Sequence, residues 1–219
     1  MTDNFEIVKR FIHVSEPQFD ADADKFYAVE IIHRAKDGSS VAVMPRSGGN
    51  SMHLIKAYYI NSIEELDKRK NEIITMCEAF NSRAYISVNT KSYEQITKQA
   101  MIEFANRIAI SDFKKPQSIF HSSVGKYVNR STQLWILDVD REDAERMNMS
   151  ISDLADFYKR IVETEVRPYK QIVAIIPTRS GKHIITHPFD TQKFFSAFPV
   201  GQNSESLIKK NNSTLLYCI

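Results

Sequence analysis

The chain has 219 residues, of which 42% are hydrophobic and 26% are charged, and its formal net charge is +2. These values are typical of a folded globular protein and exclude both a disordered chain and a polycation. A nucleic-acid-binding surface must therefore come from local clusters of lysine and arginine, not from the charge of the whole chain.

The two cysteines, Cys77 and Cys218, are far apart in the sequence and fit no metal-ligand spacing. We expect both to be small buried hydrophobic residues in a reducing compartment. The N-terminus has no apolar signal core, and no apolar run reaches the roughly 18 residues that span a bilayer. The sequence therefore predicts a cytoplasmic protein with no membrane partner.

The first 60 residues predict one helix followed by strands. Apolar residues at helical spacing predict a helix over Phe5–Val14. Partial alternation predicts strands over Phe26–Arg34 and Val41–Met44, joined by the turn residues Lys36–Ser39. The segment His53–Ile60 predicts a further strand.

The next 50 residues alternate between helix and strand. Asn61 or Ser62 can cap a helix that runs to about Phe80, and acidic residues follow the cap, where the helix dipole favours them. The segment Arg83–Asn89 predicts a strand. Ser92 can cap a second helix.

These patterns divide the chain into three parts. Residues 1–111 predict an N-terminal α/β unit, and residues 132–219 predict a second unit that packs with it in one compact domain. Between them, residues 112–131 are polar and predict a linker or a loop that faces nucleic acid. Lys114–Lys115 and Lys209–Lys210 could contact a template backbone, and each pair also fits a simple solvated surface.

The C-terminal unit predicts the order strand, helix, strand, strand, helix, strand. The strands are Gln133–Asp138, Gln171–Pro177, His183–Thr186 and Thr214–Cys218, with helices after Ser150 and over Thr191–Phe198. This order is that of the split βαβ, ferredoxin-like arrangement, in which the first and third strands are central neighbours. The sequence therefore predicts an α+β protein in which an N-terminal α/β unit packs with an RRM-like sheet.

Two acidic residues end the first strand of this unit. In a strand, residues two apart point to the same side, so Asp138 and Asp140 present their carboxylates together. Hard cations such as Mg²⁺ or Mn²⁺ suit such a pair, with substrate phosphates completing the coordination shell. The same pair also fits an exposed strand end that binds nothing.

A polar turn joins the second and third strands. In it Gly181 is able to take a positive φ. If the third strand lies beside the first, His183 approaches the two acids and its imidazole could bind a nucleotide phosphate. Arg179 and Lys182 would add positive charge, and the turn at Ser180 would add backbone N–H donors.

Competing motifs fail on geometry. The segment Arg179–Lys182 lacks the first glycine of a P-loop, and a strand follows it where a P-loop requires a helix. His183 and His187 lie about 13 Å apart along an extended strand, too far to share one metal ion. The chain also lacks the His-hydrophobic-His spacing of rolling-circle replication nucleases.

In these residues the chain resembles the archaeo-eukaryotic primase superfamily, which includes primase-polymerases. The first motif of that family is a hydrophobic strand ending in Asp-x-Asp/Glu, and Ile136–Asp140 matches it. The second is Ser-x-His, often within Ser-Gly-x-His, and Ser180–His183 matches it. The third is an apolar residue followed by Asp, for which Phe189–Asp190 is the match after the histidine.

The resemblance implies a template-dependent nucleotidyltransferase, a DNA primase or primase-polymerase in the replication of a replicon, phage or mobile element. It implies Mg²⁺ or Mn²⁺ as cofactor, with template DNA, nucleoside triphosphates and a replicative helicase as partners. It also implies Asp138 and Asp140 as catalytic metal ligands, with Asp190 as the match for a third carboxylate, and His183 as the residue that contacts the incoming nucleotide. Beside His183, the turn residues Arg179, Ser180 and Lys182 would hold the triphosphate.

Two alternatives stay open. One is a primase-like or RRM-like module that binds nucleic acid without catalysis. RNA-recognition sheets stack bases on aromatic residues; Trp135 lies on the first strand, but Lys182–His187 has no aromatic residue, which disfavours simple RRM binding. The other is a replication-initiator endonuclease, which would need a tyrosine nucleophile beside a metal-bound histidine pair, and the sequence has no such pair.

Overall fold

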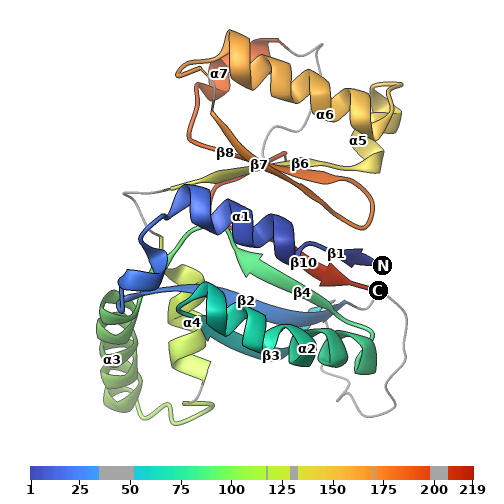
Figure 1. The fold of residues 1–219 in the computed structure, drawn as a ribbon. Coiled ribbons are helices and arrows are strands. Elements are labelled where there is room, and N and C mark those ends of the chain that lie inside the picture. The colour runs from blue at the N-terminus through green and yellow to red at the C-terminus, as the bar shows by residue number, and fades with distance from the viewer. Residues whose placement is uncertain (35–51, 117, 129–132, 170, 198–206) are drawn as a thin grey trace.

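Two antiparallel β-sheets carry the fold, one above the other in the view of Figure 1. The computed structural model describes residues 1–34, 52–116, 118–128, 133–169, 171–197 and 207–219. The predicted strand Val41–Met44 and the turn Lys36–Ser39 lie outside these residues. The protein is α+β, as the sequence predicted, with helices packed on both sheets.

The larger sheet comes mainly from the N-terminal half of the chain. Its strand order is β1-β10-β4-β2-β3, and β5 pairs with β2 beside this path. The strands are β1 (Thr2–Asp3), β2 (Lys25–Arg34), β3 (Met52–Ile60), β4 (Arg83–Ser87), β5 (Lys91–Ser92) and β10 (Ser213–Cys218). The predictions for β2, β3 and β4 are confirmed, with ends that differ by two residues at most.

Helices cover both faces of the larger sheet. They are α1 (Phe5–Ser15), α2 (Ile63–Ala79), α3 (Tyr93–Ala109) and α4 (Ser118–Lys126), with a 3-10 turn, η1 (Phe19–Ala21), after α1. Val29 and Ile31 of β2 pack with α1 and α2, whereas Phe26 and Ala28 pack with α3 and α4. This division follows the alternation of side chains along a strand. Among the helices of the described segments, none is long and apolar enough to cross a membrane.

Serine caps begin α2 and α3 as the sequence predicted. Ser62 Oγ accepts a hydrogen bond from Glu65 N at 3.1 Å, and Ser92 Oγ accepts one from Gln95 N at 3.1 Å. Each cap satisfies a backbone N–H that has no partner within its own helix.

The polar segment predicted as a linker contains a helix. α4 lies within residues 112–131, and its Ile119 and Val124 are buried. Val124 joins Ile96 of α3 and Phe26 of β2 in a small core. With so few inward-facing apolar residues, the periodicity of α4 is too short to stand out in the sequence.

The smaller sheet comes from the C-terminal half. Its strand order is β7-β8-β6-β9, and every neighbouring pair is antiparallel. The strands are β6 (Trp135–Val139), β7 (Ile172–Pro177), β8 (Lys182–Thr186) and β9 (Ile208–Lys209). The prediction that the first and third strands are neighbours is confirmed by the pairing of β6 with β8.

Helices cover one face of the smaller sheet (Figure 1). They are α5 (Arg141–Arg146), α6 (Ile151–Arg160), a π-helical turn η3 (Ile161–Glu165) and α7 (Thr191–Ser196). The sequence predicted α6 and α7 and missed α5. Ser150 Oγ accepts from Asp153 N at 3.1 Å, so the predicted cap of α6 is confirmed. The opposite face of the sheet turns toward the larger sheet and α1.

The last strand departs from the prediction. Thr214–Cys218 was predicted as the fourth strand of the C-terminal sheet, but β10 pairs with β4 and β1 in the larger sheet, and the short β9 takes the fourth position. The consecutive residues Leu215, Leu216 and Tyr217 are all buried, which fits a strand covered on both faces. The predicted C-terminal unit, residues 132–219, thus gives its last strand to the other sheet.

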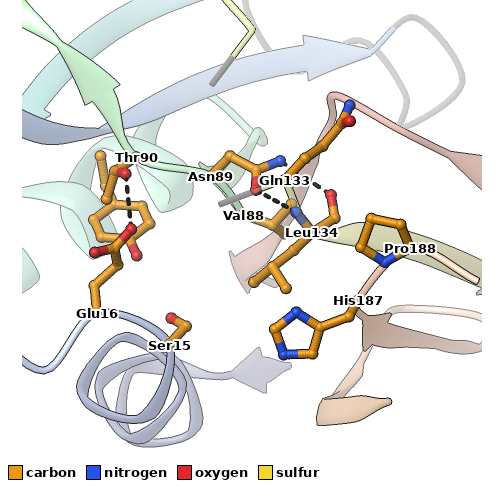
Figure 2. A pocket seen from close by; sticks show the side chains of 10 residues that line it. Ser15, Glu16, Val88, Asn89, Thr90, Gln133, Leu134, His187 and Pro188 are labelled. Atoms are coloured by element: carbon orange, nitrogen blue, oxygen red, sulfur yellow. Dashed lines mark hydrogen bonds between the residues drawn. The ribbon is translucent and has the colours of Figure 1, made fainter. Parts of the chain in front are cut away.

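Two buried asparagines join the sheets. Asn89 Oδ1 accepts from Leu134 N at 2.6 Å and Asn89 Nδ2 donates to Leu134 O at 3.0 Å, just before β6 (Figure 2). Asn4 Nδ2 donates to Pro177 O at 2.8 Å and to Leu215 O at 2.9 Å. The side-chain amides thus serve backbone groups of both sheets and fix how the sheets meet.

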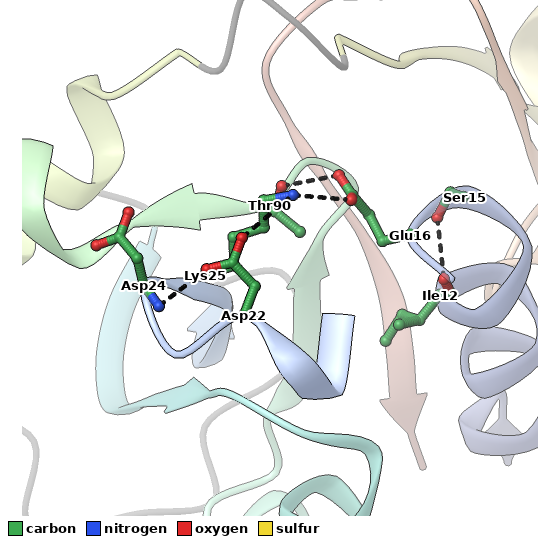
Figure 3. Close-up of polar contacts among 7 residues, drawn as sticks. All are labelled: Ile12, Ser15, Glu16, Asp22, Asp24, Lys25 and Thr90. Atoms are coloured by element: carbon green, nitrogen blue, oxygen red, sulfur yellow. Dashed lines mark hydrogen bonds and ion pairs between the residues drawn. The ribbon is translucent and has the colours of Figure 1, made fainter. Parts of the chain in front are cut away.

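A partly buried carboxylate holds the end of α1 against the larger sheet. Glu16 Oε1 accepts from Thr90 Oγ1 at 3.1 Å, and Glu16 Oε2 lies 3.2 Å from Lys25 Nζ (Figure 3). These contacts link the residue after α1 to the start of β2 and to the loop between β4 and β5.

We predict that Asn89→Ala lowers the free energy of unfolding by about 2 to 4 kcal/mol. The substitution leaves the buried N–H and C=O groups of Leu134 without their partner. Chemical denaturation measures the change. Asn106→Ala makes the same change at an exposed position of α3 and serves as control. Equal stability of the two variants would contradict a role for Asn89 at the junction.

Candidate active site

Residues from both sheets line a pocket of about 470 Å³. The smaller sheet and its loops contribute Asp138, Asp140, Arg179, Ser180, His183 and Lys209. The larger sheet contributes Glu30, Ile32, Arg34, Met52, Arg83 and Tyr85. The pocket therefore depends on how the sheets are joined and belongs to neither half of the chain alone.

Strand register brings the first motif and the second motif together. Asp138 of β6 lies directly opposite His183 of β8, so the two side chains share one face of the sheet. His183 Nε2 lies 3.3 Å from Asp138 Oδ1, as the sequence predicted from neighbouring strands. On its other side, His183 Nδ1 lies 2.9 Å from Thr214 Oγ1 of β10, which holds the buried imidazole in place.

Asp138 is the most strongly perturbed acid of the pocket. Its Oδ2 forms an ion pair with Lys209 Nζ. Burial alone would raise the pKa of Asp138, but hydrogen bonds and charge from His183 and Lys209 lower that pKa to about 2. The carboxylate is therefore ionised at neutral pH. Lys209 was predicted as a possible contact to a template backbone, and in the structure its ammonium group pairs with Asp138.

Asp140 lines the pocket and also caps the N-terminus of α5. Its Oδ1 accepts a hydrogen bond from Asp143 N at 3.0 Å. Within the described segments, no group of three or more His, Cys, Asp or Glu side chains gathers as a metal site. Asp138 and Asp140 are two carboxylates in one pocket lining, and carboxylate oxygens are the ligand type that hard cations such as Mg²⁺ prefer.

At Gly181 the backbone of the hairpin between β7 and β8 lies directly against the end of β6. A Cβ atom at this position would lie 1.9 Å from Val139 O and 3.0 Å from Asp140 Cα. The φ of Gly181 is not in the positive range, so the glycine is required here by the close approach and not by a left-handed backbone. Thr178 N donates to Gly181 O at 2.9 Å and closes the turn, which leaves Arg179 and Ser180 at the pocket.

Lys182 does not reach the pocket. It lies opposite Val139, one residue from the facing pair Asp138 and His183, so its side chain points to the helical face of the sheet. There Lys182 Nζ donates to Ser152 Oγ at 3.2 Å. Its predicted role in binding the triphosphate therefore has no support from its position.

Asp190 also lies apart from the two acids. It caps α7, where its Oδ1 accepts from Gln192 N at 3.0 Å and from Lys193 N at 3.1 Å. His183 lies near the start of β8, opposite Asp138. Asp190 follows the other end of this strand, after Thr186. The structure does not bring it into the pocket lining.

Sequence reasoning missed the contribution of the larger sheet. Arg83 lies opposite Ile32, and Tyr85 lies opposite Glu30, so these side chains share the face that lines the pocket. The Arg34 guanidinium lies 4.9 Å from the centre of the Tyr85 ring. Polar residues at alternate positions of otherwise apolar strands were the available signal, but only the fold places them beside Asp138.

Charged side chains of both signs line the pocket. Arginine and lysine side chains enter from both sheets, from β2 and β4 on one side and from the hairpin and β9 on the other. The carboxylates of Asp138 and Asp140 lie among them. A triphosphate with its metal ion has both kinds of charge, and arginine is suited to binding phosphate.

Comparisons with known proteins add no relative. No protein-family model matches the chain, and neither the curated proteins nor the solved structures contain a significant match. The resemblance to primases therefore rests on the two sequence motifs, Ile136–Asp140 and Ser180–His183.

We predict that Gly181→Ala lowers the free energy of unfolding by about 1 to 3 kcal/mol, because the new methyl group collides with backbone atoms of β6. Thermal or chemical denaturation measures the effect. The control is Gly125→Ala, where nothing lies within 4 Å of the added atom and alanine favours the helix. The idea fails if Gly181→Ala is as stable as the native chain.

Proposed function

We propose that this protein is a primase-like nucleotidyltransferase that adds nucleotides on a DNA template. The observation that carries the proposal is the meeting of both motifs in one pocket, with Asp138 and His183 3.3 Å apart and Asp140 on the same rim. Two short motifs from separate parts of the chain would rarely meet in this way unless the site had a function.

The strand order of the smaller sheet supports a finer description of the fold as RRM-like. Counted along the chain, β6, β7, β8 and β9 are the first to fourth strands, and the sheet order is second, third, first, fourth. α6 connects the first strand to the second, and α7 lies between the third and the fourth. This order fits the split βαβ arrangement, with the site on the face opposite α6 and α7.

In the proposed reaction Asp138 and Asp140 hold the Mg²⁺ or Mn²⁺ ion. When bound, this ion would neutralise the triphosphate and favour attack by the primer 3′-hydroxyl. His183, kept in position by Thr214, would donate to a phosphate oxygen, and Arg179 beside Ser180 would add charge-assisted hydrogen bonds. These groups are preorganised around the place where negative charge develops.

The larger sheet would hold the nucleic acid. Arg34 and Arg83 supply positive charge on the pocket wall, and Tyr85, which is buried beneath the Arg34 guanidinium, holds that arginine in place. Template DNA and nucleoside triphosphates are the proposed partners, and a replicative helicase is a further one. A cytoplasmic location fits this role in the replication of a replicon, phage or mobile element.

A second function is favoured by one specific observation. Both carboxylate oxygens of Asp138 already have partners, His183 and Lys209, and Asp190 lies outside the pocket lining. A primase-like module that binds nucleic acid without catalysis would tolerate such a site. Incorporation of nucleotides distinguishes the two functions.

We predict that the native chain incorporates labelled nucleotide on a primed or unprimed DNA template with Mn²⁺. Asp138→Ala and Asp140→Ala should each lower the rate at least about 100-fold, because the metal ion loses a ligand. Asp190→Asn preserves a cap for α7 and should keep the native rate. Both ribonucleotides and deoxynucleotides need to be supplied.

Equal incorporation by the native chain and the two alanine variants would remove the enzymatic proposal. DNA binding without incorporation would favour the non-catalytic module. A large loss in Asp190→Asn would instead bring the third acid back into the reaction.

We also predict that Arg34→Gln weakens DNA binding similarly for all sequences, since the arginine would contact a phosphate. The slope of log affinity against log salt should fall by about 0.7 to 0.9 for each contact that is lost. Fluorescence anisotropy over a range of salt measures this. Arg10→Gln, at an exposed site of α1 outside the pocket lining, is the control. Unchanged affinity and slope for Arg34→Gln would place the DNA elsewhere.

A further inference from the structure

Lys209 gives the pocket a cation of its own. β9 pairs with β6 so that Lys209 lies opposite Ile136, and Asp138 is the next residue on the same face. The ammonium group forms an ion pair with Asp138 Oδ2 while His183 contacts Oδ1, so both carboxylate oxygens are engaged. The side chain of Asp138 is only 21% exposed and that of Lys209 is 34% exposed.

A divalent ion that binds Asp138 meets this lysine. The ammonium group and the ion need the same carboxylate, and like charges on one partly buried acid repel each other strongly. Displacement of Lys209 would leave its charge in a partly buried place without its partner, which costs free energy. Binding of the metal ion alone is therefore opposed by Lys209.

An anionic ligand removes this cost. Lys209 lines the same pocket as Arg179 and Ser180, so its ammonium group can reach a phosphate held there. Lysine is a common phosphate ligand, and its long side chain permits a change of partner without movement of the strand.

We propose that Lys209 is a resident counter-cation that competes with the divalent ion for Asp138 and passes to the nucleotide phosphates when both bind. The metal ion and the nucleotide would then bind cooperatively, since each relieves the charge that opposes the other. This inference rests on the proposed nucleotidyltransferase function and names how its site avoids holding metal without substrate.

Metal binding without nucleotide tests the first half. Mn²⁺ is titrated into the metal-free chain, and free Mn²⁺ is followed by electron paramagnetic resonance. Lys209→Met should bind Mn²⁺ about tenfold more tightly than the native chain, within the usual range of coupling between sites. Lys210→Met removes the same charge one residue away, where the ammonium group lies over the Trp135 ring, and should change the affinity little.

Nucleotide binding tests the second half. The affinity for a fluorescent, non-hydrolysable nucleotide is measured at saturating Mn²⁺, where Lys209→Met should bind about tenfold more weakly. Opposite signs for the metal and the nucleotide are the signature of a cation that changes partners, and a purely structural lysine would not produce them. Lys209→Gln, which keeps an N–H donor for Asp138, repeats both comparisons if the methionine variant fails to fold.

The outcomes separate this inference from the function on which it rests. If Mn²⁺ binding requires Asp138 but is no tighter in Lys209→Met, the competition is wrong and the metal site stands. If nucleotide affinity is unchanged in that variant, the transfer to phosphate is wrong. If the native chain binds no Mn²⁺ even with nucleotide present, the metal site and the proposed function both fall.

Discussion

The pairing of β6 with β8 in one register is the constraint on which the candidate site depends. In that register Asp138 faces His183 and their side chains share one side of the sheet. A shift by one residue would place one of them on the helical face, where Lys182 now lies. Gly181 protects the register, because its lack of a side chain lets the hairpin close against the end of β6.

The junction of the two sheets turns this pair into a pocket. After β9 in the smaller sheet, the chain enters the larger sheet as β10, and Thr214 of β10 contacts His183. Asn4 and Asn89 bind backbone groups across the junction. Because the loss of these hydrogen bonds would leave buried polar groups without partners, they help to fix the angle between the sheets. Because each wall of the pocket comes from a different sheet, small changes in this angle would change the distance between the walls.

Electrostatics explains why an acid can remain charged so deep in the structure. Burial opposes the ionised form of Asp138 by raising its pKa, and hydrogen bonds and charge from His183 and Lys209, which lie on different strands, outweigh this effect. The charge of Asp138 already has a partner within the protein, because Lys209 is in contact with the carboxylate. A cation that binds Asp138 would therefore have to replace Lys209 or His183 at the carboxylate.

The sequence by itself determined the α+β class, most of the helices and strands, and the neighbourhood of Asp138 and His183, because these follow from periodicity, capping residues and the order of elements. Only the tertiary structure decided where β10 pairs, that α4 fills the presumed linker, and that Arg34 and Tyr85 face the same pocket. Likewise, alternation within β8 turned Lys182 away. The physical reason is that local patterns fix which side of an element is buried, whereas the choice of partner depends on burial between segments far apart in the chain.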